Sequence, residues 1–164
     1  MLISTGIVGR FDPSHDTSAT VDFVEIPWSD AGKRRLRRPT KGGIDFAISL
    51  EHSEYLFHGA VLLDTDEHVV IVSRPEEPAV IIDLDQHGPI QDVLQRAARI
   101  GHAFGNQHIP IEVINCSILA PVLTNQSVLE KTIRDLGLGD LRIRFDTVRL
   151  ATSRPLIMTG HTHG

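Results

Sequence analysis

The chain has very little of what marks a secreted, disulfide-stabilised or membrane-embedded protein. Cys116 is the single cysteine among 164 residues, so no intrachain disulfide forms and a reducing, cytoplasmic setting is favoured. No apolar run approaches the ~20 residues that span a bilayer, and the residues after Met1 show no signal-peptide pattern. We therefore expect a cytoplasmic protein with no membrane partner.

Motifs of the common enzyme classes are also missing. The chain has no G-x-x-x-x-G-K-[ST] phosphate loop, no G-x-S-x-G nucleophile motif, no H-E-x-x-H and no C-x-x-C. These absences argue against the common hydrolase and redox chemistries, and we expect a protein that is not an enzyme.

Basic residues are few and concentrated in one segment. Nine positions hold six of the sixteen basic residues, and the rest of the chain carries ten basic against twenty-one acidic residues. We call this segment the basic cluster: Lys33, Arg34, Arg35, Arg37, Arg38 and Lys41. One patch is too small for a general nucleic-acid footprint, so no nucleic-acid partner is expected. Solvated charge is the simple interpretation, and a docking patch for an acidic protein is the sharper one.

The first half of the chain has the pattern of a small all-β domain. Ile44–Leu50 alternates between apolar and polar residues, as a half-buried strand does. Four further short segments rich in β-branched residues are separated by Gly, Pro, Asp and Ser: Leu2–Val8, Thr20–Ile26, Ala60–Leu63 and His68–Ser73. We predict a sandwich or barrel over residues 1–77.

The second half, residues 78–152, mixes helices and strands. After a predicted linker at Arg74–Pro78 come a strand at 80–84, a helix that begins near Pro89, strands at 111–114 and 118–119, a helix from 127 to 137, and a strand at 141–145. This βαββαβ order is that of a ferredoxin-like domain. The predicted class is therefore α+β, with a flexible tail at residues 153–164.

The ends of both helices carry recognisable signals. Val93, Ala97, Ile100 and Phe104 recur at helical spacing, and Gly105 is placed to end the first helix as its C′ residue. The second helix follows a capping-box match in which Ser127 is the N-cap.

Histidine is the one residue type in the chain whose placement suggests chemistry. His108 follows the predicted helix end, and His161 and His163 lie two residues apart near the C-terminus. An isolated histidine at a helix end is favoured by the macrodipole alone, and tail histidines can be simply solvated. If two copies of the chain pair around His108, however, their imidazoles and the tail histidines together make a metal site.

In the order and spacing of its motifs the chain resembles the urease accessory protein UreE family of nickel metallochaperones. Gly105-Asn106-Gln107-His108 is similar to the family's Gly-Asn-Arg-His segment, and Gly160–His163 is similar to its Gly-His-x-His ending. Upstream, Arg35–Gly43 and Ile44–Leu50 look like the strand pair of its N-terminal domain. The similarity runs from about residue 8 to the end.

The resemblance implies a homodimer that binds nickel between its ferredoxin-like domains. His108 of both subunits would hold Ni²⁺, with His161 or His163 completing the site, and Zn²⁺ or Cu²⁺ would also bind. The resemblance further implies an N-terminal domain that engages partner proteins, here the urease apoprotein and urease accessory proteins that include the accessory GTPase.

The chain departs from the family pattern in three places. Gln107 stands where arginine is usual, which leaves the ligand at His108 in place. The stretch Leu123–Ser127 lacks the second histidine pair of some members, and the tail is short. We therefore expect one interfacial ion per dimer and no nickel storage.

The hypothesis is a nickel carrier for urease maturation, and two alternatives stay open. Neutral imidazole is the ligand form, so binding by this carrier should fade below pH ~6.5, the ordinary imidazole value. The first alternative is an adaptor that bridges urease assembly proteins through the basic cluster, with metal binding incidental. The second, a metal-dependent hydrolase, needs an acid beside the ion, and Glu112 is the nearest in sequence.

Overall fold

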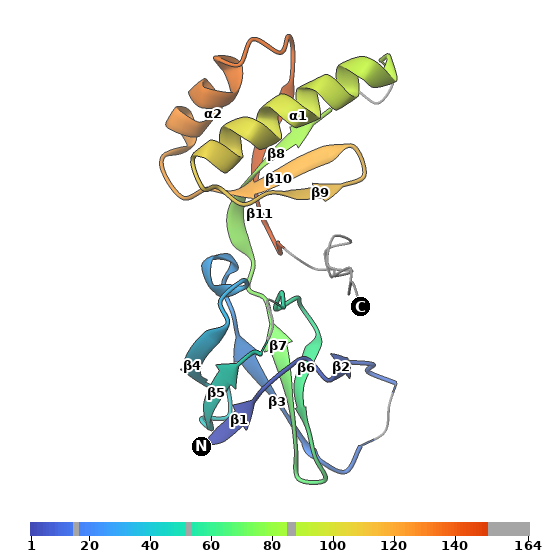
Figure 1. Ribbon diagram of the computed structural model, residues 1–164, viewed down its shortest axis with the longest axis vertical. Coiled ribbons are helices and arrows are strands. Elements are labelled where there is room, and N and C mark those ends of the chain that lie inside the picture. The colour runs from blue at the N-terminus through green and yellow to red at the C-terminus, as the bar shows by residue number, and fades with distance from the viewer. Residues whose placement is uncertain (15–16, 52–53, 85–87, 151–164) are drawn as a thin grey trace, which may run out of the picture. The chain divides into compact units, whose positions relative to one another are not determined.

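The computed structural model describes residues 1–14, 17–51, 54–84 and 88–150 (Figure 1). The described chain forms two compact units, Met1–Pro75 and Glu76–Leu150, which we call the N-terminal unit and the C-terminal unit. The first is built of strands, and the second mixes strands with two helices. The predicted α+β class is confirmed. No helix in the described ranges is long and apolar enough to cross a membrane.

Two sheets make up the N-terminal unit. The first has the order β1-β5-β4 and contains β1 (Leu2–Ser4), β4 (Arg35–Pro39) and β5 (Asp45–Ser49). The second has the order β2-β6-β7-β3 and contains β2 (Gly9–Arg10), β3 (Thr20–Glu25), β6 (Ala60–Asp64) and β7 (His68–Ser73). A short 3-10 helix, η1 (Trp28–Asp30), lies between β3 and β4. β4 and β5 form the hairpin that the family resemblance implies.

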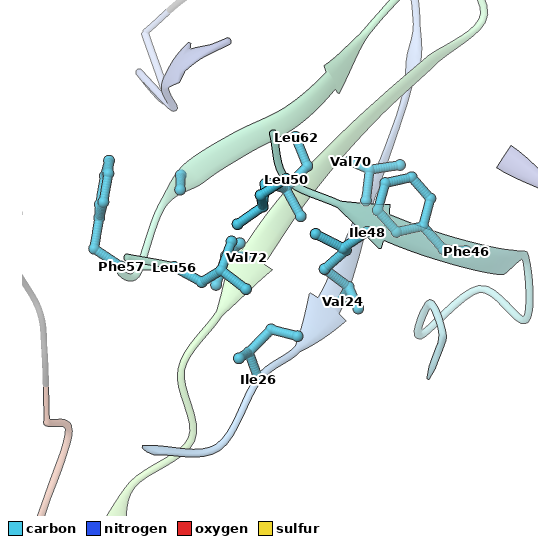
Figure 2. Close-up of a cluster of buried hydrophobic side chains, with 11 residues drawn as sticks. Val24, Ile26, Phe46, Ile48, Leu50, Leu56, Phe57, Leu62, Val70 and Val72 are labelled. Carbon is cyan, nitrogen blue, oxygen red and sulfur yellow. The ribbon is translucent and has the colours of Figure 1, made fainter. Parts of the chain in front are cut away.

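The core of this unit lies between its two sheets. The inward side chains of β5, Phe46 and Ile48, share one apolar cluster with Val70 and Val72 of β7 (Figure 2). None of the four is more than 2% exposed. Full burial of such a side chain stabilises a fold by roughly 1.5–3 kcal/mol, so the alternating pattern of β5 is explained by this core.

The unbroken apolar run of β7 has a different cause. Val70 and Val72 face the core between the sheets, whereas Val69 and Ile71 face a second cluster that contains Val61. A strand that is covered on both faces has no need of polar alternation.

Asp22 of β3 ties the β4–β5 turn to the second sheet. Its Oδ1 accepts hydrogen bonds from the backbone N–H groups of Phe23, at 2.7 Å, and Gly42, at 3.0 Å, and Lys41 N–H donates to the Phe23 carbonyl at 2.8 Å. A Cβ on Gly42 would lie 2.6 Å from Asp22 Oδ2, so this close approach requires glycine. Burial alone would raise the pKa of Asp22, but the hydrogen bonds from Thr40, Phe23 and Gly42 outweigh it and hold the pKa below its ordinary value.

The C-terminal unit has the ferredoxin-like order βαββαβ. In sequence it contains β8 (Glu77–Asp83), α1 (Ile90–Asn106), β9 (Glu112–Ile114), β10 (Ser117–Pro121), α2 (Gln126–Arg134) and β11 (Arg142–Val148). The sheet order is β11-β8-β10-β9, and every neighbouring pair is antiparallel. Ile100 and Phe104 of α1 and Ile133 of α2 are fully buried together with Val80 and Ile82 of β8.

Several element boundaries differ from the sequence predictions, among them those of β1, β8 and α2. The first β-strand ends at Ser4, whereas the pattern predicted Val8. The predicted linker is shorter, because β8 already begins at Glu77 and pairs there with β11. The predicted cap of α2 is wrong: Asn125 is the N-cap, and its side chain accepts a hydrogen bond from Ser127 N–H at 2.8 Å. Asparagine is at least as good an N-cap as serine, so the N-cap lies two residues earlier than predicted.

Candidate metal site

The predicted end of α1 is wrong by three residues, because the C′ position falls on His108 and not on Gly105. The sequence placed Gly105 as the C′ residue, but α1 continues through Gly105 to Asn106, and Gln107 is the C-cap. The C′ residue is His108, with φ of +56°.

The turn around His108 is a Schellman motif. Ile109 N–H donates to the Phe104 carbonyl at 2.9 Å, and His108 N–H donates to the Gly105 carbonyl at 3.0 Å. Ile109 and Phe104 also belong to the same apolar cluster, which is the side-chain contact that accompanies this motif. The apolar pair five residues apart was the signal in the sequence that could have located the turn.

His108 occupies a backbone conformation that favours glycine. A left-handed residue with a Cβ costs roughly 1–2 kcal/mol, and glycine is the usual C′ residue for that reason. Both hydrogen bonds of the turn are formed, so the backbone strain is confined to His108 itself. An unfavourable residue that persists at such a position points to a role for its side chain.

The His108 side chain is exposed at the end of α1. Nearby in sequence, Asn106 Nδ2 donates to His102 Nε2 at 3.0 Å, one helical turn apart. This bond engages the ring nitrogen of His102, whereas no bond to the His108 ring is seen from the described residues. Among the described residues, both ring nitrogens of His108 are therefore without a hydrogen-bond partner, whereas Nε2 of His102 has one.

One chain does not supply a complete site from its described residues. No group of three or more His, Cys, Asp or Glu side chains is close enough to hold a metal ion within residues 1–14, 17–51, 54–84 and 88–150. His161 and His163 lie outside the described residues. Cys116, at the β9–β10 turn, is half-buried and free, and its carbonyl accepts from Leu84 N–H at 2.8 Å. His108 is thus the predicted ligand that the structure describes.

An exposed apolar face runs along α1 beside its buried stripe. At 100° per residue, Ile90, Leu94, Ala98 and Gly105 fall within about 80° of arc. Ile90 is 67% and Leu94 62% exposed, which is unusual for side chains of this size on a helix that is otherwise polar outside its core. The face ends at Gly105, whose carbonyl accepts the His108 N–H.

The apolar face continues onto the edge strand β9. A Cβ on Gly101 would lie 3.5 Å from Ile111 Cδ1, so this side of α1 faces the segment that leads into β9. Val113 is 61% exposed and lies opposite Ile118 in the register, on the sheet face that α1 covers. We call the set the apolar strip: Ile90, Leu94, Ala98, Gly105 and Val113. The sequence analysis did not predict the apolar strip. The available signal was the apolar arc of α1, which is wider than the part of the helix that is buried.

The basic cluster lies on and around β4 in the N-terminal unit. Buried Asp30 forms ion pairs with Lys33, at 2.6 Å, and with Arg38. The Lys33 ammonium lowers the pKa of Asp30, and the Arg38 guanidinium adds to this against the opposing effect of burial. Arg37 makes a two-pronged contact with Asp45 across the hairpin at 2.9 and 2.8 Å. Part of the cluster therefore stabilises the hairpin.

Comparison with known proteins leads to one class, the urease accessory proteins. Residues 5–73 match the family model described as UreE urease accessory protein, N-terminal domain. The chain is 29% identical over 144 residues to the urease accessory protein UreE of Yersinia intermedia, which is 85% of this chain and 63% of that protein. It is 24% identical over 142 residues to the UreE of Lysinibacillus sphaericus (strain C3-41), 87% of this chain and 86% of that protein.

Within that class the matches point to a single family, UreE. A third relative, the UreE of Yersinia bercovieri, is 30% identical over 131 residues, 77% of this chain and 58% of that protein. The chain spans less than two thirds of the length of both Yersinia relatives. The resemblance to the UreE family that the sequence motifs carry is confirmed.

Proposed function

We propose that this protein is a urease accessory metallochaperone, which binds nickel between two copies of the chain and delivers it for assembly of the urease active site. The observation that carries the proposal is the exposed imidazole of His108 in a left-handed C′ position, where glycine is favoured. A side chain retained against that preference is best explained by ligand chemistry, and imidazole is a good ligand for nickel.

A homodimer follows from the number of ligands. Exposed His108 alone makes a poor site, and the described residues of one chain add no cluster that could complete it. Two-fold symmetry doubles the imidazoles. The apolar strip supports pairing on this side of the C-terminal unit, because Ile90 and Leu94 of α1 and Val113 of β9 are more than half exposed, and the strip ends at Gly105, three residues before His108.

Carrier function favours a site that both holds and releases its cargo. The two His108 imidazoles form the fixed part. His161 or His163, tethered to the same dimer, would add ligands at high effective concentration and could be withdrawn when nickel is handed on. The same proposal places the protein in the cytoplasm, with the urease apoprotein and the accessory GTPase as its partners.

Nickel titration by calorimetry tests the proposal. The wild-type protein should bind one nickel ion per two chains, and His108→Ala should lose this site. His102→Ala is the matched control, because His102 is an exposed histidine on the same helix and should bind as wild type does. Truncation after residue 152 should weaken binding at least about tenfold while the stoichiometry stays the same. Unchanged affinity and stoichiometry in His108→Ala would refute the proposal.

The adaptor alternative is supported by the basic cluster, whose charges exceed their local counterions. It predicts that substitutions in Lys33–Lys41 abolish urease maturation while His108→Ala does not. Measuring urease activation with both sets of variants separates the two functions.

A further inference from the structure

The free edge of β4 has a hydrogen-bonding pattern that can be derived from the register of the hairpin. Leu50 N–H donates to the Arg34 carbonyl and Thr40 N–H to the Ile44 carbonyl, each at 2.8 Å. In an antiparallel pair such bonds occur at every second residue. The backbone groups of Arg34, Leu36, Arg38 and Thr40 therefore face β5, and those of Arg35 and Arg37 face away from it.

β4 is the outer strand of its sheet, as Figure 1 shows. No strand of the described chain pairs with this edge. Pro39, at the end of β4, has no N–H to offer. The edge thus presents two N–H donors, from Arg35 and Arg37, and the carbonyls of Arg35, Arg37 and Pro39. These groups are a template for one short added strand.

The charge of the basic cluster is only partly neutralised within the N-terminal unit. Within the described residues its ion pairs are with two carboxylates, Asp30 and Asp45. Arg34 donates to the neutral carbonyl of Glu51 at 2.6 Å and forms no ion pair among the residues that the structure describes. Arg35 and Lys41 are exposed and form no ion pair within the described residues. The excess of positive charge therefore lies on β4 and in the residues that directly flank it.

We propose that the free edge of β4 binds an extended acidic segment of a partner protein, which adds to the sheet as a further strand. Arg35 and Arg37 are two residues apart and expose their side chains on one face. A paired strand places its own side chains about 4.5–5.5 Å from them. Because Arg37 is already paired with Asp45, the added strand should carry Asp or Glu opposite Arg35, with the backbone supplying affinity and the acid supplying specificity.

The same charges explain why β4 does not pair with itself. Two copies of this edge would bring arginines opposite arginines, which is destabilising. Charged residues and proline commonly prevent edge-to-edge aggregation of strands. Here the arginines disfavour pairing with a positively charged strand and favour pairing with an acidic one. The proposal goes beyond nickel carriage and does not depend on metal binding at His108.

A peptide probe tests the proposal on the full-length, metal-free protein. The probe is a fluorescein-labelled ten-residue peptide of alternating Glu and Val, and binding is followed by fluorescence anisotropy. Two matched peptides separate the contributions: one has Gln in place of Glu, and the other keeps every Glu but has Pro in place of alternate Val. Both should bind at least about tenfold more weakly than the probe, because the first lacks charge and the second lacks backbone donors.

Two variants locate the site. Arg35→Glu should weaken probe binding at least about tenfold, whereas Arg142→Glu should bind as wild type does. Arg142 is the matched control, because it is an exposed arginine on β11, the edge strand of the other unit. His108→Ala should also bind the probe as wild type does, so failure of this proposal and failure of the nickel proposal are distinguishable.

Amide hydrogen exchange by NMR reports the strand itself. Probe binding should newly protect the amides of Arg35 and Arg37, while that of Leu36 is protected already. The proposal is overturned if the Gln or Pro peptide binds as well as the probe, or if both amides stay unprotected in the complex. It is also overturned if a single-stranded oligonucleotide binds the edge more tightly than the probe, since that would assign the charge to nucleic acid.

Discussion

The two units of this chain present different kinds of surface: the first is polar and charged, and the second combines an imidazole with apolar side chains. The N-terminal unit presents an edge strand with unpaired backbone groups and an excess of cations, part of which Asp30 and Asp45 anchor. The C-terminal unit presents an imidazole on a strained turn beside an apolar strip. Charge acts over distance and is weakened by salt, whereas a ligand and an apolar contact act at close range. In our two proposals, recognition of a partner and capture of an ion therefore belong to separate units of one short chain.

The largest expected effect comes from placing a charge in the apolar strip. Leu94→Glu should leave the fold of the monomer intact, because the side chain is already 62% exposed. A carboxylate forced into an apolar contact should weaken the dimer by about 2 kcal/mol or more. Sedimentation velocity over a concentration series measures this, and nickel affinity should fall in parallel because the site needs two chains.

Val128→Glu is the control for Leu94→Glu. Val128 is 58% exposed on α2, a helix that the dimer proposal leaves uncovered, so this variant should stay dimeric. If Val128→Glu dissociates the dimer and Leu94→Glu does not, the interface lies on α2, and its proposed location on α1 is wrong.

A somewhat smaller effect is expected in the N-terminal unit at Asp22. Asp22→Asn puts an amide N–H₂ where the carboxylate accepts from backbone N–H groups, and should lower the free energy of unfolding by about 2 kcal/mol. The folded-state pKa of Asp22 lies below its ordinary value of 3.8. The stabilisation is therefore present above pH 3.8 and is lost as the pH falls through the lower folded-state pKa.

Urea unfolding of both proteins between pH 7 and pH 2.5 checks this dependence. The difference between wild type and Asp22→Asn should be largest at neutral pH and should shrink in acid. Asp66→Asn, at an exposed position of the same unit, should show a difference of less than about 0.5 kcal/mol at every pH. A difference for Asp22→Asn that grows in acid would mean that the sign of the pKa shift is wrong.

The smallest effect is a gain of stability at His108. His108→Gly should raise the stability of the C-terminal unit by about 1 kcal/mol, because glycine is relaxed in the left-handed position, while nickel binding is lost. His102→Gly lies inside α1 and should instead destabilise by about 1 kcal/mol. Thermal unfolding of metal-free protein, followed by the helical circular dichroism signal, measures both. A destabilised His108→Gly would remove the strain argument for a functional histidine.

Much of this fold is predictable because local patterns and tertiary burial agree. His68–Ser73 was predicted with the bounds that β7 has, since its β-branched run suits a strand covered on both faces. The βαββαβ order followed from periodicity in the same way. Two-residue β2 was beyond prediction, because only its pairing with β6 defines it.

The candidate ligand His108 could be chosen from the sequence, but the geometry of its turn was missed. His108 could be singled out from its place after a helix pattern and from the family resemblance. Its left-handed backbone could not, because glycine at 105 offered a stronger local stop signal than the Phe104–Ile109 contact that ends the helix. The apolar strip was missed for a similar reason: periodicity gives an apolar arc, and only the packed structure divides it into a buried and an exposed part.

A crystal of the protein soaked in nickel, with the anomalous signal of the metal, tests the central claim most directly. We expect one strong anomalous peak on a two-fold axis, within coordination distance of the His108 imidazoles of two chains. A peak held within a single chain by other residues, with both His108 side chains unliganded, would contradict it.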